Sequence, residues 1–130
     1  KALFRTKSRT RLAMEAWMAE WAEYYDNDRV VIMQIPRSLC LDYKATEADV
    51  EELSSLAALV AGTDCGVTLR ELEPGKVKIS LRTGPRVNAT KVCALLGGGG
   101  HAAAAGATLS ATLSEAKQAV LQAIDMVVGE

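Results

Sequence analysis

Hydrophobic and polar residues alternate over residues 76–83, a pattern that predicts a β-strand. Apolar side chains occupy every second position from Val77 to Leu81, and polar side chains occupy the positions between them, from Lys78 to Arg82. An extended chain places these two sets on opposite faces of a sheet. Residues 65–72 also have strand composition, and the intervening Glu73-Pro74-Gly75 consists of turn formers. We therefore predict a hairpin of two antiparallel strands.

Two further segments are expected to be strands. Residues 29–35 are apolar on both faces, which is typical of a central strand covered by helices on both sides, and Pro36 is expected to end it. Residues 104–109 are predicted to form a short strand.

Helical spacing of apolar residues and capping residues predict four helices. They are expected at 9–25, at 47–61 with Thr46 and Asp49 as a capping box, at 89–96 after Asn88, and after Thr112 and Glu115 to the C-terminus. Asp26-Asn27-Asp28 is expected to end the first helix, Gly62 to cap the second, and Leu95 to point inward from the third.

This order of elements predicts the fold class. It indicates an α+β (α/β layered) domain with a mixed β-sheet of about four to five strands flanked by helices. The 130 residues suit one compact domain. We expect residues 1–28 to form an interdomain linker and helix, and residues 29–130 to form the domain itself.

Composition and charge limit the functions to consider. Net charge is −1, so the chain is not an electrostatic binding surface for long duplex nucleic acid. A basic strip over residues 1–11 is read as a solvated linker, with guidance of an anionic substrate as the alternative. No apolar run reaches the roughly 18–20 residues that cross a bilayer, so no membrane partner is expected. Three cysteines without a C-x-x-C pair indicate reduced thiols and a cytoplasmic protein.

The run Gly97-Gly98-Gly99-Gly100 before His101 is the most informative feature. One glycine would cap a helix, but four exceed any cap, and each costs about 0.5–1 kcal/mol in backbone entropy. Such a run favours a backbone that closely approaches an anionic ligand, with a flexible hinge as the alternative. The residues that follow exclude a P-loop, and the preceding helix excludes a dinucleotide-binding fingerprint.

Three polar side chains suit phosphate. His101 is the only histidine and can donate to phosphate, although a structural role is the more ordinary one for a lone histidine. Ser80 and Arg82 share a strand face, and a guanidinium matches phosphate bidentately; an ordinary solvent-facing edge is the alternative. Arg86 is a weaker candidate. One histidine without clustered acids makes a metal site in this chain unexpected.

These segments together resemble a known family. The strand Val77–Thr83, the glycine run with His101, and Ala104-Ala105-Gly106 are similar to the DHH-associated C-terminal domain of DHH phosphoesterases, whose pattern is K-x-S-L-R-S, a short helix, then G-G-G-H-x-x-A-A-G. The similarity extends over about residues 29–128 and is greatest to the nanoRNase/pAp-phosphatase branch and to RecJ-like exonucleases. Thr83 stands where the family often has serine.

The resemblance implies a substrate-binding domain of a two-domain hydrolase. An N-terminal DHH domain of the same protein, expected outside this chain, would hold two manganese ions and cut; this fragment alone would hold no cofactor and be inactive. By the resemblance, Ser80 and Arg82 contact phosphate, with Thr83 a weaker candidate. The resemblance also implies that the nucleotide end is wrapped by Gly98, Gly99, Gly100 and His101, and that Ala104 and Ala105 keep the strand behind them slim.

Several functions stay open. The partner is expected to be a nucleotide or a short single-stranded oligonucleotide. Oligoribonucleotide, 3′,5′-bisphosphorylated nucleoside, cyclic dinucleotide and single-stranded DNA all remain as substrates, and a homodimer is left open. The alternative is an RNA-binding or dimerising appendage like the C-terminal domain of alanyl-tRNA synthetases. A third reading is a purely structural interaction domain.

Overall fold

A six-stranded mixed sheet forms the centre of the protein. The computed structural model describes residues 7–129. The strands lie in the order β1-β2-β3-β4-β6-β5. The elements are α1 (Arg9–Glu20), β1 (Glu23–Tyr25), β2 (Val30–Ile35), α2 (Arg37–Asp42), α3 (Glu47–Leu53), η1 (Leu56–Leu59), β3 (Cys65–Glu73), β4 (Lys76–Thr83), α4 (Ala89–Leu95), β5 (Gly99–His101), β6 (Ala104–Leu109) and α5 (Leu113–Val128).

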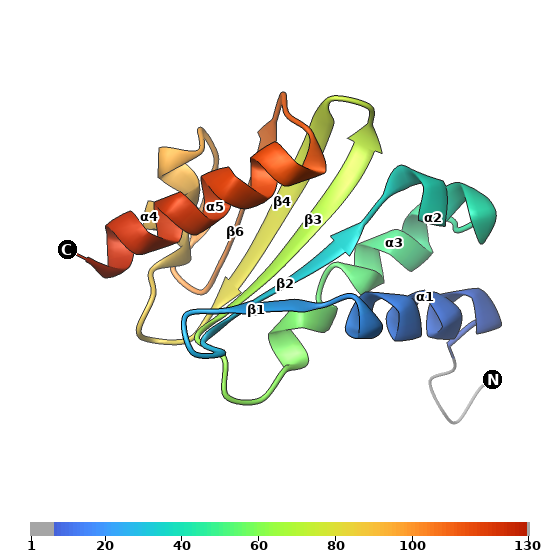
Figure 1. The fold of residues 1–130 in the computed structure, drawn as a ribbon, viewed down its shortest axis with the longest axis horizontal. Coiled ribbons are helices and arrows are strands. Elements are labelled where there is room, and N and C mark those ends of the chain that lie inside the picture. The colour runs from blue at the N-terminus through green and yellow to red at the C-terminus, as the bar shows by residue number, and fades with distance from the viewer. Residues whose placement is uncertain (1–6, 130) are drawn as a thin grey trace.

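The helices cover the two faces of this sheet unequally (Figure 1). One core joins α4 and α5 to β2, β3, β4 and β6, and includes Ile32, Leu69 and Ile79. The second core joins α1, α2, α3 and η1 mainly to β2, and includes Met14 and Ile35. The predicted layered α+β class is confirmed. On the second face, however, the strands beyond β3 carry half-buried and exposed residues.

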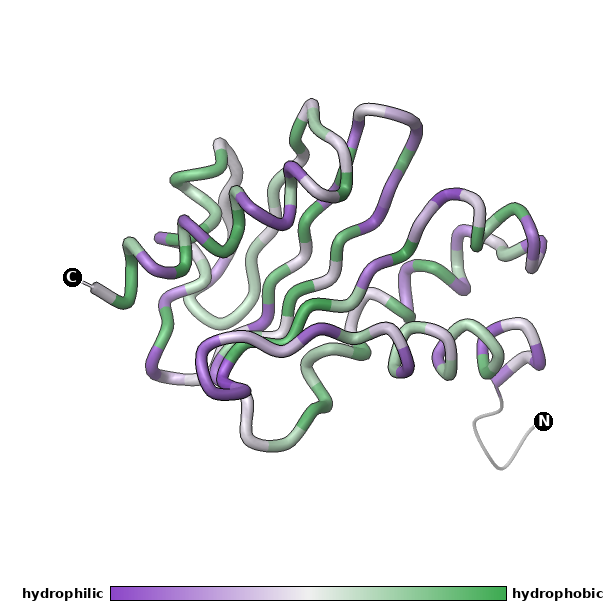
Figure 2. The backbone as a smooth tube through the Cα atoms, viewed as in Figure 1, coloured by the Kyte–Doolittle hydropathy of each residue, from purple (hydrophilic) through white to green (hydrophobic). Residues whose placement is uncertain are grey.

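The predicted hairpin is β3 and β4, and the alternation along β4 sets its two faces. Val77, Ile79 and Leu81 are fully buried in the first core, whereas Lys78, Ser80 and Arg82 are half-buried on the opposite face. The alternation of hydrophobic and hydrophilic residues along the strand is visible in Figure 2. β2 also has the predicted central place, since it pairs with β1 on one side and in parallel with β3 on the other.

The helix predicted over residues 9–25 is confirmed up to Glu20 and is wrong over its last five residues. α1 ends at Glu20, and Glu23–Tyr25 forms β1, which pairs antiparallel with β2. Tyrosines favour strands, and pairing with the exposed edge of β2 stabilises the extended form. Asp26-Asn27-Asp28 is the turn of this hairpin and does not end the helix. All three residues have positive φ, near 60°, which Asp and Asn tolerate better than most residues.

The helix predicted over residues 47–61 is also shorter than expected. The Thr46–Asp49 capping box is confirmed, but α3 ends at Leu53 and the chain continues as the 3₁₀ helix η1. The buried hydroxyl of Thr68 on β3 donates to the carbonyl oxygen of Ser54, which holds the chain at the point where α3 ends. Gly62 was predicted to cap this helix; it has a positive φ of 84°, but Ser54 caps α3 and Val60 caps η1. The short helix α2 was not predicted from the sequence.

The strand count is six, not four to five, because β1 replaces the end of the predicted first helix and the glycine run contains β5. Gly99–His101 pairs antiparallel with Ala104–Leu109 at one edge of the sheet. Backbone hydrogen bonding formed this strand where side-chain patterning gives no signal. The caps at Asn88 and Thr112 are confirmed, whereas Leu95 is 52% exposed and does not point inward.

Residues 1–28 were expected to form an interdomain linker and helix, and the helix of this segment, α1, packs on the sheet. Met14 and Met18 are fully buried, and Arg11 forms an ion pair with Glu52 of α3. Lys7 pairs with Glu15 at 2.9 Å, so two cations of the basic strip are neutralised. Lys1 and Arg5 lie outside the described residues. No helix in the described part of the chain is long and apolar enough to cross a membrane.

Candidate functional site

The sheet register aligns two of the predicted site residues across three strands. Arg82 of β4 pairs with Ala104 of β6, and Ala104 pairs with His101 of β5. Directly paired residues on antiparallel strands point to the same face, so the guanidinium and the imidazole stand on one side of the sheet. With strands about 4.8 Å apart, their backbones are roughly 10 Å apart. Only the methyl group of Ala104 stands between them.

The next row of paired residues on the same face has even smaller side chains. Ser80 of β4 pairs with Gly106, and Gly106 pairs with Gly99. The hydroxyl of Ser80 therefore has no side chain beside it across two strands. The two rows form a slim floor bordered by polar groups, which we call the open strip. The open strip consists of Ser80, Arg82, Gly99, His101, Ala104 and Gly106.

The polar groups of the open strip are not used by the fold. Among residues 7–129, no hydrogen bond or ion pair engages the side chains of Ser80, Arg82 or His101. Lys78 lies in the next row and adds positive charge. Arg70, which pairs with Lys78 across the strands, is held by Glu47 through two hydrogen bonds of 2.8 and 2.7 Å. The strip therefore offers donors and net positive charge to an anion.

The four glycines before His101 have different roles. Gly97 has φ +81° and ends α4 in a Schellman arrangement, since Gly97 N donates to Ala94 O and Gly98 N donates to Cys93 O. A Cβ on Gly98 would lie 2.1 Å from the carbonyl oxygen of Gly106. A Cβ on Gly100, whose φ is +150°, would lie 2.6 Å from Cα of Ala105.

Only Gly99 has no such constraint. It has an ordinary φ, and a Cβ there would meet nothing within 4 Å. Gly98 and Gly100 are explained by close packing on β6, and Gly97 by its φ. The nucleotide contact implied for Gly98, Gly99 and Gly100 stays a prediction, and packing accounts for the missing side chain at Gly98 and Gly100 but not at Gly99.

The β5–β6 turn is tied directly to the end of β4. The hydroxyl of Thr83 donates to the carbonyl oxygen of Ala102 at 3.1 Å, and the amide of Thr83 donates to Ala103 at 2.9 Å. The amide of Ala89 donates to the same Ala102 oxygen at 2.7 Å. The Thr83 hydroxyl proton is thus committed to the fold, which supports a positioning role more than the phosphate contact predicted for it.

Comparison with known proteins identifies the family. The family model of the DHHA1 domain matches residues 27–130, most of the chain. The chain belongs to the DHHA1 domain family.

Relatives of this DHHA1 domain are much longer. A bifunctional oligoribonuclease and PAP phosphatase, NrnA, from Thermus thermophilus is 42% identical over 79 residues, which are 60% of this chain and 24% of that protein. An exopolyphosphatase-related protein from Bacteroides fragilis has a TM-score of 0.85 at 21% identity, over 98% of this chain and 37% of that one. The pGpG-specific phosphodiesterase PggH from Vibrio cholerae has a TM-score of 0.63 at 13% identity, over 93% and 40%. The two structures show the fold, and the chain spans well under half of each protein.

The two arginines predicted to bind phosphate border different pockets of the DHHA1 domain. Arg82 borders a pocket of about 250 Å³ at the end of β4, together with Asp64, Thr83 and Gly84. Arg86 borders a smaller pocket on the α5 side, with Arg29, Val87 and Ile124. The structure therefore does not bring Arg86 to the open strip, and its predicted role is the least supported of the set.

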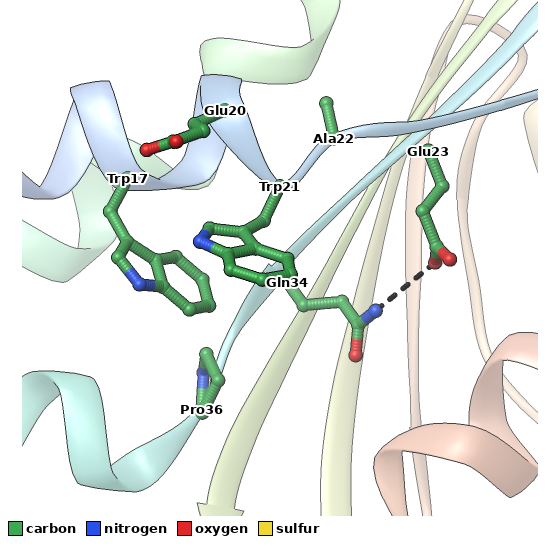
Figure 3. Close-up of a pocket in the computed structure, with 7 residues that line it drawn as sticks. All are labelled: Trp17, Glu20, Trp21, Ala22, Glu23, Gln34 and Pro36. Atoms are coloured by element: carbon green, nitrogen blue, oxygen red, sulfur yellow. Dashed lines mark hydrogen bonds between the residues drawn. The ribbon is translucent and has the colours of Figure 1, made fainter.

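A third pocket lies at the opposite edge of the sheet and has the wrong chemistry for phosphate. It is lined by Trp17 and Trp21, whose ring centroids are 6.0 Å apart, and by Glu20, Glu23 and Gln34 among others (Figure 3). The Glu23 carboxylate accepts from Gln34 and from Lys117 of α5, each at 3.2 Å. No basic side chain lines this pocket, so an anion would meet the uncompensated Glu20.

No group of three or more histidine, cysteine, aspartate or glutamate residues within residues 7–129 is placed to hold a metal ion. The manganese ions implied for the DHH domain thus remain a prediction about residues elsewhere.

Sequence reasoning missed one member of the strip. Gly106 was known only as part of a motif, yet it forms the floor between Ser80 and Gly99. Its role depends on the pairing of three strands, which no local pattern reveals.

Proposed function

We propose that this DHHA1 domain is the substrate-holding half of a DHH-family phosphoesterase that acts on short oligoribonucleotides or 3′,5′-bisphosphorylated nucleosides. The open strip grips a phosphate of the substrate and the nucleoside attached to it. Hydrolysis belongs to an N-terminal DHH domain of the same protein, where two manganese ions would activate water and polarise the phosphate.

One observation carries this proposal. Arg82, Ser80 and His101 stand on one face of the sheet, unpaired by the fold, around a floor made of glycine and alanine. His101 is exposed and Ser80 and Arg82 are half-buried, so all three side chains are accessible to a ligand, and the fold does not use their donors. Phosphate, which offers acceptors, suits the guanidinium of Arg82 and the hydroxyl of Ser80.

Each side chain has a distinct task in the proposed complex. The Arg82 guanidinium gives two parallel N–H donors to phosphate oxygens, and Ser80 adds a hydroxyl donor from the same strand. His101 donates from the facing edge, across about 10 Å, so it contacts a second part of the ligand. The bare floor at Gly99 and Gly106 lets the ligand lie close to the sheet.

The substrate class rests on the relative in Thermus thermophilus. That protein is named for action on oligoribonucleotides and PAP, and its identity of 42% covers 60% of this chain. A ligand that is both short and phosphate-rich fits a strip only three strands wide.

Isothermal titration with pAp and with a 5′-phosphorylated diribonucleotide tests the proposal. Arg82→Ala and His101→Ala should each weaken binding about tenfold or more, the loss typical of a charge-assisted hydrogen bond. Lys76→Ala is the matched control, because Lys76 is exposed at the hairpin end of the same strand. Unchanged affinity in both site variants would refute the site assignment.

A further inference from the structure

The pocket beside Arg82 contains a carboxylate that the proposed phosphate contacts do not use. Asp64 lies at the start of β3 and borders this pocket of about 250 Å³ with Arg82. The other walls are small or short: Ala58, Thr63, Gly66 and Gly84. Because Arg82 belongs both to this pocket and to the open strip, the pocket continues the strip beyond β4.

The backbone of Asp64 is fixed by its neighbours. Its amide donates to the carbonyl oxygen of Arg29 at 2.6 Å, and its own carbonyl oxygen accepts from Gly84 at 3.0 Å. These bonds hold the residue between the start of β2 and the end of β4. Its side chain is half-buried and, among residues 7–129, makes no hydrogen bond or ion pair, even with Arg82. An unpaired acceptor on a fixed backbone therefore borders the same pocket as the unpaired donor of Arg82, and Asp64 also borders the smaller pocket that contains Arg86.

A carboxylate beside a phosphate-binding arginine needs a ligand group that donates. Phosphate has no donor near neutral pH and would be repelled by Asp64. In a nucleotide the donors are the ribose hydroxyls and the base N–H groups, and the sugar is bonded directly to the phosphate. The pocket lining contains no aromatic side chain on which a base would stack, whereas its small walls leave room for a sugar.

We infer that this pocket is a ribose subsite, in which the Asp64 carboxylate accepts a hydrogen bond from the 2′-hydroxyl of the nucleotide whose phosphate Arg82 holds. Acidic residues serve dinucleotide-binding domains in the same way, and the 2′-hydroxyl is the group that separates RNA from DNA. Asp64 is then the residue that selects ribonucleotides. This inference rests on the proposed function, since it requires phosphate at Arg82.

The test compares a 5′-phosphorylated diadenosine ribonucleotide with its 2′-deoxy counterpart, titrated into the 130-residue chain. Wild type should bind the ribonucleotide about tenfold more tightly, as expected for one hydrogen bond to a charged acceptor. Asp64→Ala should reduce that ratio to about one, because only the ribonucleotide loses a hydrogen bond while the relief of charge repulsion is common to both ligands, and Asp64→Asn should leave an intermediate ratio. Asp125→Ala, an exposed acid on α5, is the matched control and should keep the wild-type ratio.

The outcomes separate this inference from the proposed function. A wild-type ratio near one, or a ratio unchanged in Asp64→Ala, overturns the ribose subsite while Arg82-dependent binding of both ligands still upholds the phosphate site. No Arg82-dependent binding of either ligand overturns both. Thermal unfolding of Asp64→Ala should match wild type, because the side chain has no partner in the described structure, so a changed ratio reports on the ligand.

Discussion

The hydroxyl of Thr83 donates a hydrogen bond to the carbonyl oxygen of Ala102 at 3.1 Å. Thr83 ends β4, one residue after Arg82, and Ala102 follows His101 in the β5–β6 turn. This bond therefore links the two elements that carry the opposite borders of the open strip. The separation of the backbones at Arg82 and His101 is therefore set by the fold.

Thr83→Val tests this positioning role because valine has the shape of threonine without the donor. We expect the free energy of unfolding to fall by about 0.5–1 kcal/mol, since one hydrogen bond is lost and the Ala89 amide still bonds Ala102. Nucleotide affinity should fall, and Thr83→Ser should restore it. Urea unfolding and calorimetric titration measure the two effects. Wild-type affinity in Thr83→Val would mean that the strip needs no such link.

Alanine substitutions in the glycine run should separate effects on folding from effects on nucleotide binding. Gly98→Ala should destabilise the domain by about 1–3 kcal/mol, because its Cβ would overlap the backbone of β6 at Gly106. Gly99→Ala should fold normally, since open space surrounds that position, but should weaken nucleotide binding by placing a methyl group over the strip. Denaturation curves and titrations of both variants check this. Full affinity in Gly99→Ala would show that the ligand does not pass over Gly99.

The Glu47–Arg70 pair beside the strip predicts a pH dependence of stability. The hydrogen bonds and charge of Arg70 lower the pKa of Glu47 below its ordinary value of 4.5. Because the pKa is lower in the folded state, the pair stabilises the fold above about pH 4.5, and this contribution is lost as pH falls through the folded-state pKa. The effect should be small, since Glu47 is largely exposed.

Thermal unfolding of wild type and Glu47→Gln from about pH 7 to about pH 3 measures the pH dependence that the Glu47–Arg70 pair contributes. The two melting temperatures should differ at pH 7 and converge at low pH. Glu20→Gln, whose carboxylate has no partner among residues 7–129, is the control and should show no such convergence. Parallel curves for Glu47→Gln and wild type would contradict a stabilising pair.

The three thiols should differ in reactivity because their burial differs. Burial, with the nearby charges of Asp64 and Asp26, raises the pKa of Cys65 to about 12, and burial also raises the pKa values of Cys40 and Cys93. Cys65 and Cys93 have no exposed surface, whereas Cys40 is half-buried. Iodoacetamide at about pH 8 should modify Cys40 first and Cys65 only after unfolding, as mass spectrometry can show. Equal rates for Cys40 and Cys65 in the native protein would contradict this packing.

The parts of the fold that depend on side-chain pattern were predictable from the sequence. β4 alternates, β2 is apolar on both faces, and the caps at Thr46, Asn88 and Thr112 each begin a helix. The elements that were missed depend on long-range pairing. β1 exists because β2 offers an edge, and β5 exists because β6 offers another, although glycines have low strand propensity.

The same division applies to the site. The residue types of Ser80, Arg82 and His101 indicated phosphate, and alternation placed the first two on one face. That His101 stands on the same face, two strands away, follows only from the register Arg82–Ala104–His101. The roles of Gly98 and Gly100 in packing, and the freedom of Gly99, required the contacts of β6.

The most direct measurement maps the ligand on the protein. In ¹H–¹⁵N NMR spectra, addition of pAp should shift the signals of His101, Gly99 and Gly106, together with the side-chain signal of Arg82, because these groups surround the proposed ligand. The indole signals of Trp17 and Trp21 at the opposite edge should stay in place. Shifts confined to the tryptophan pocket, or to any surface away from the open strip, would contradict nucleotide binding at the open strip.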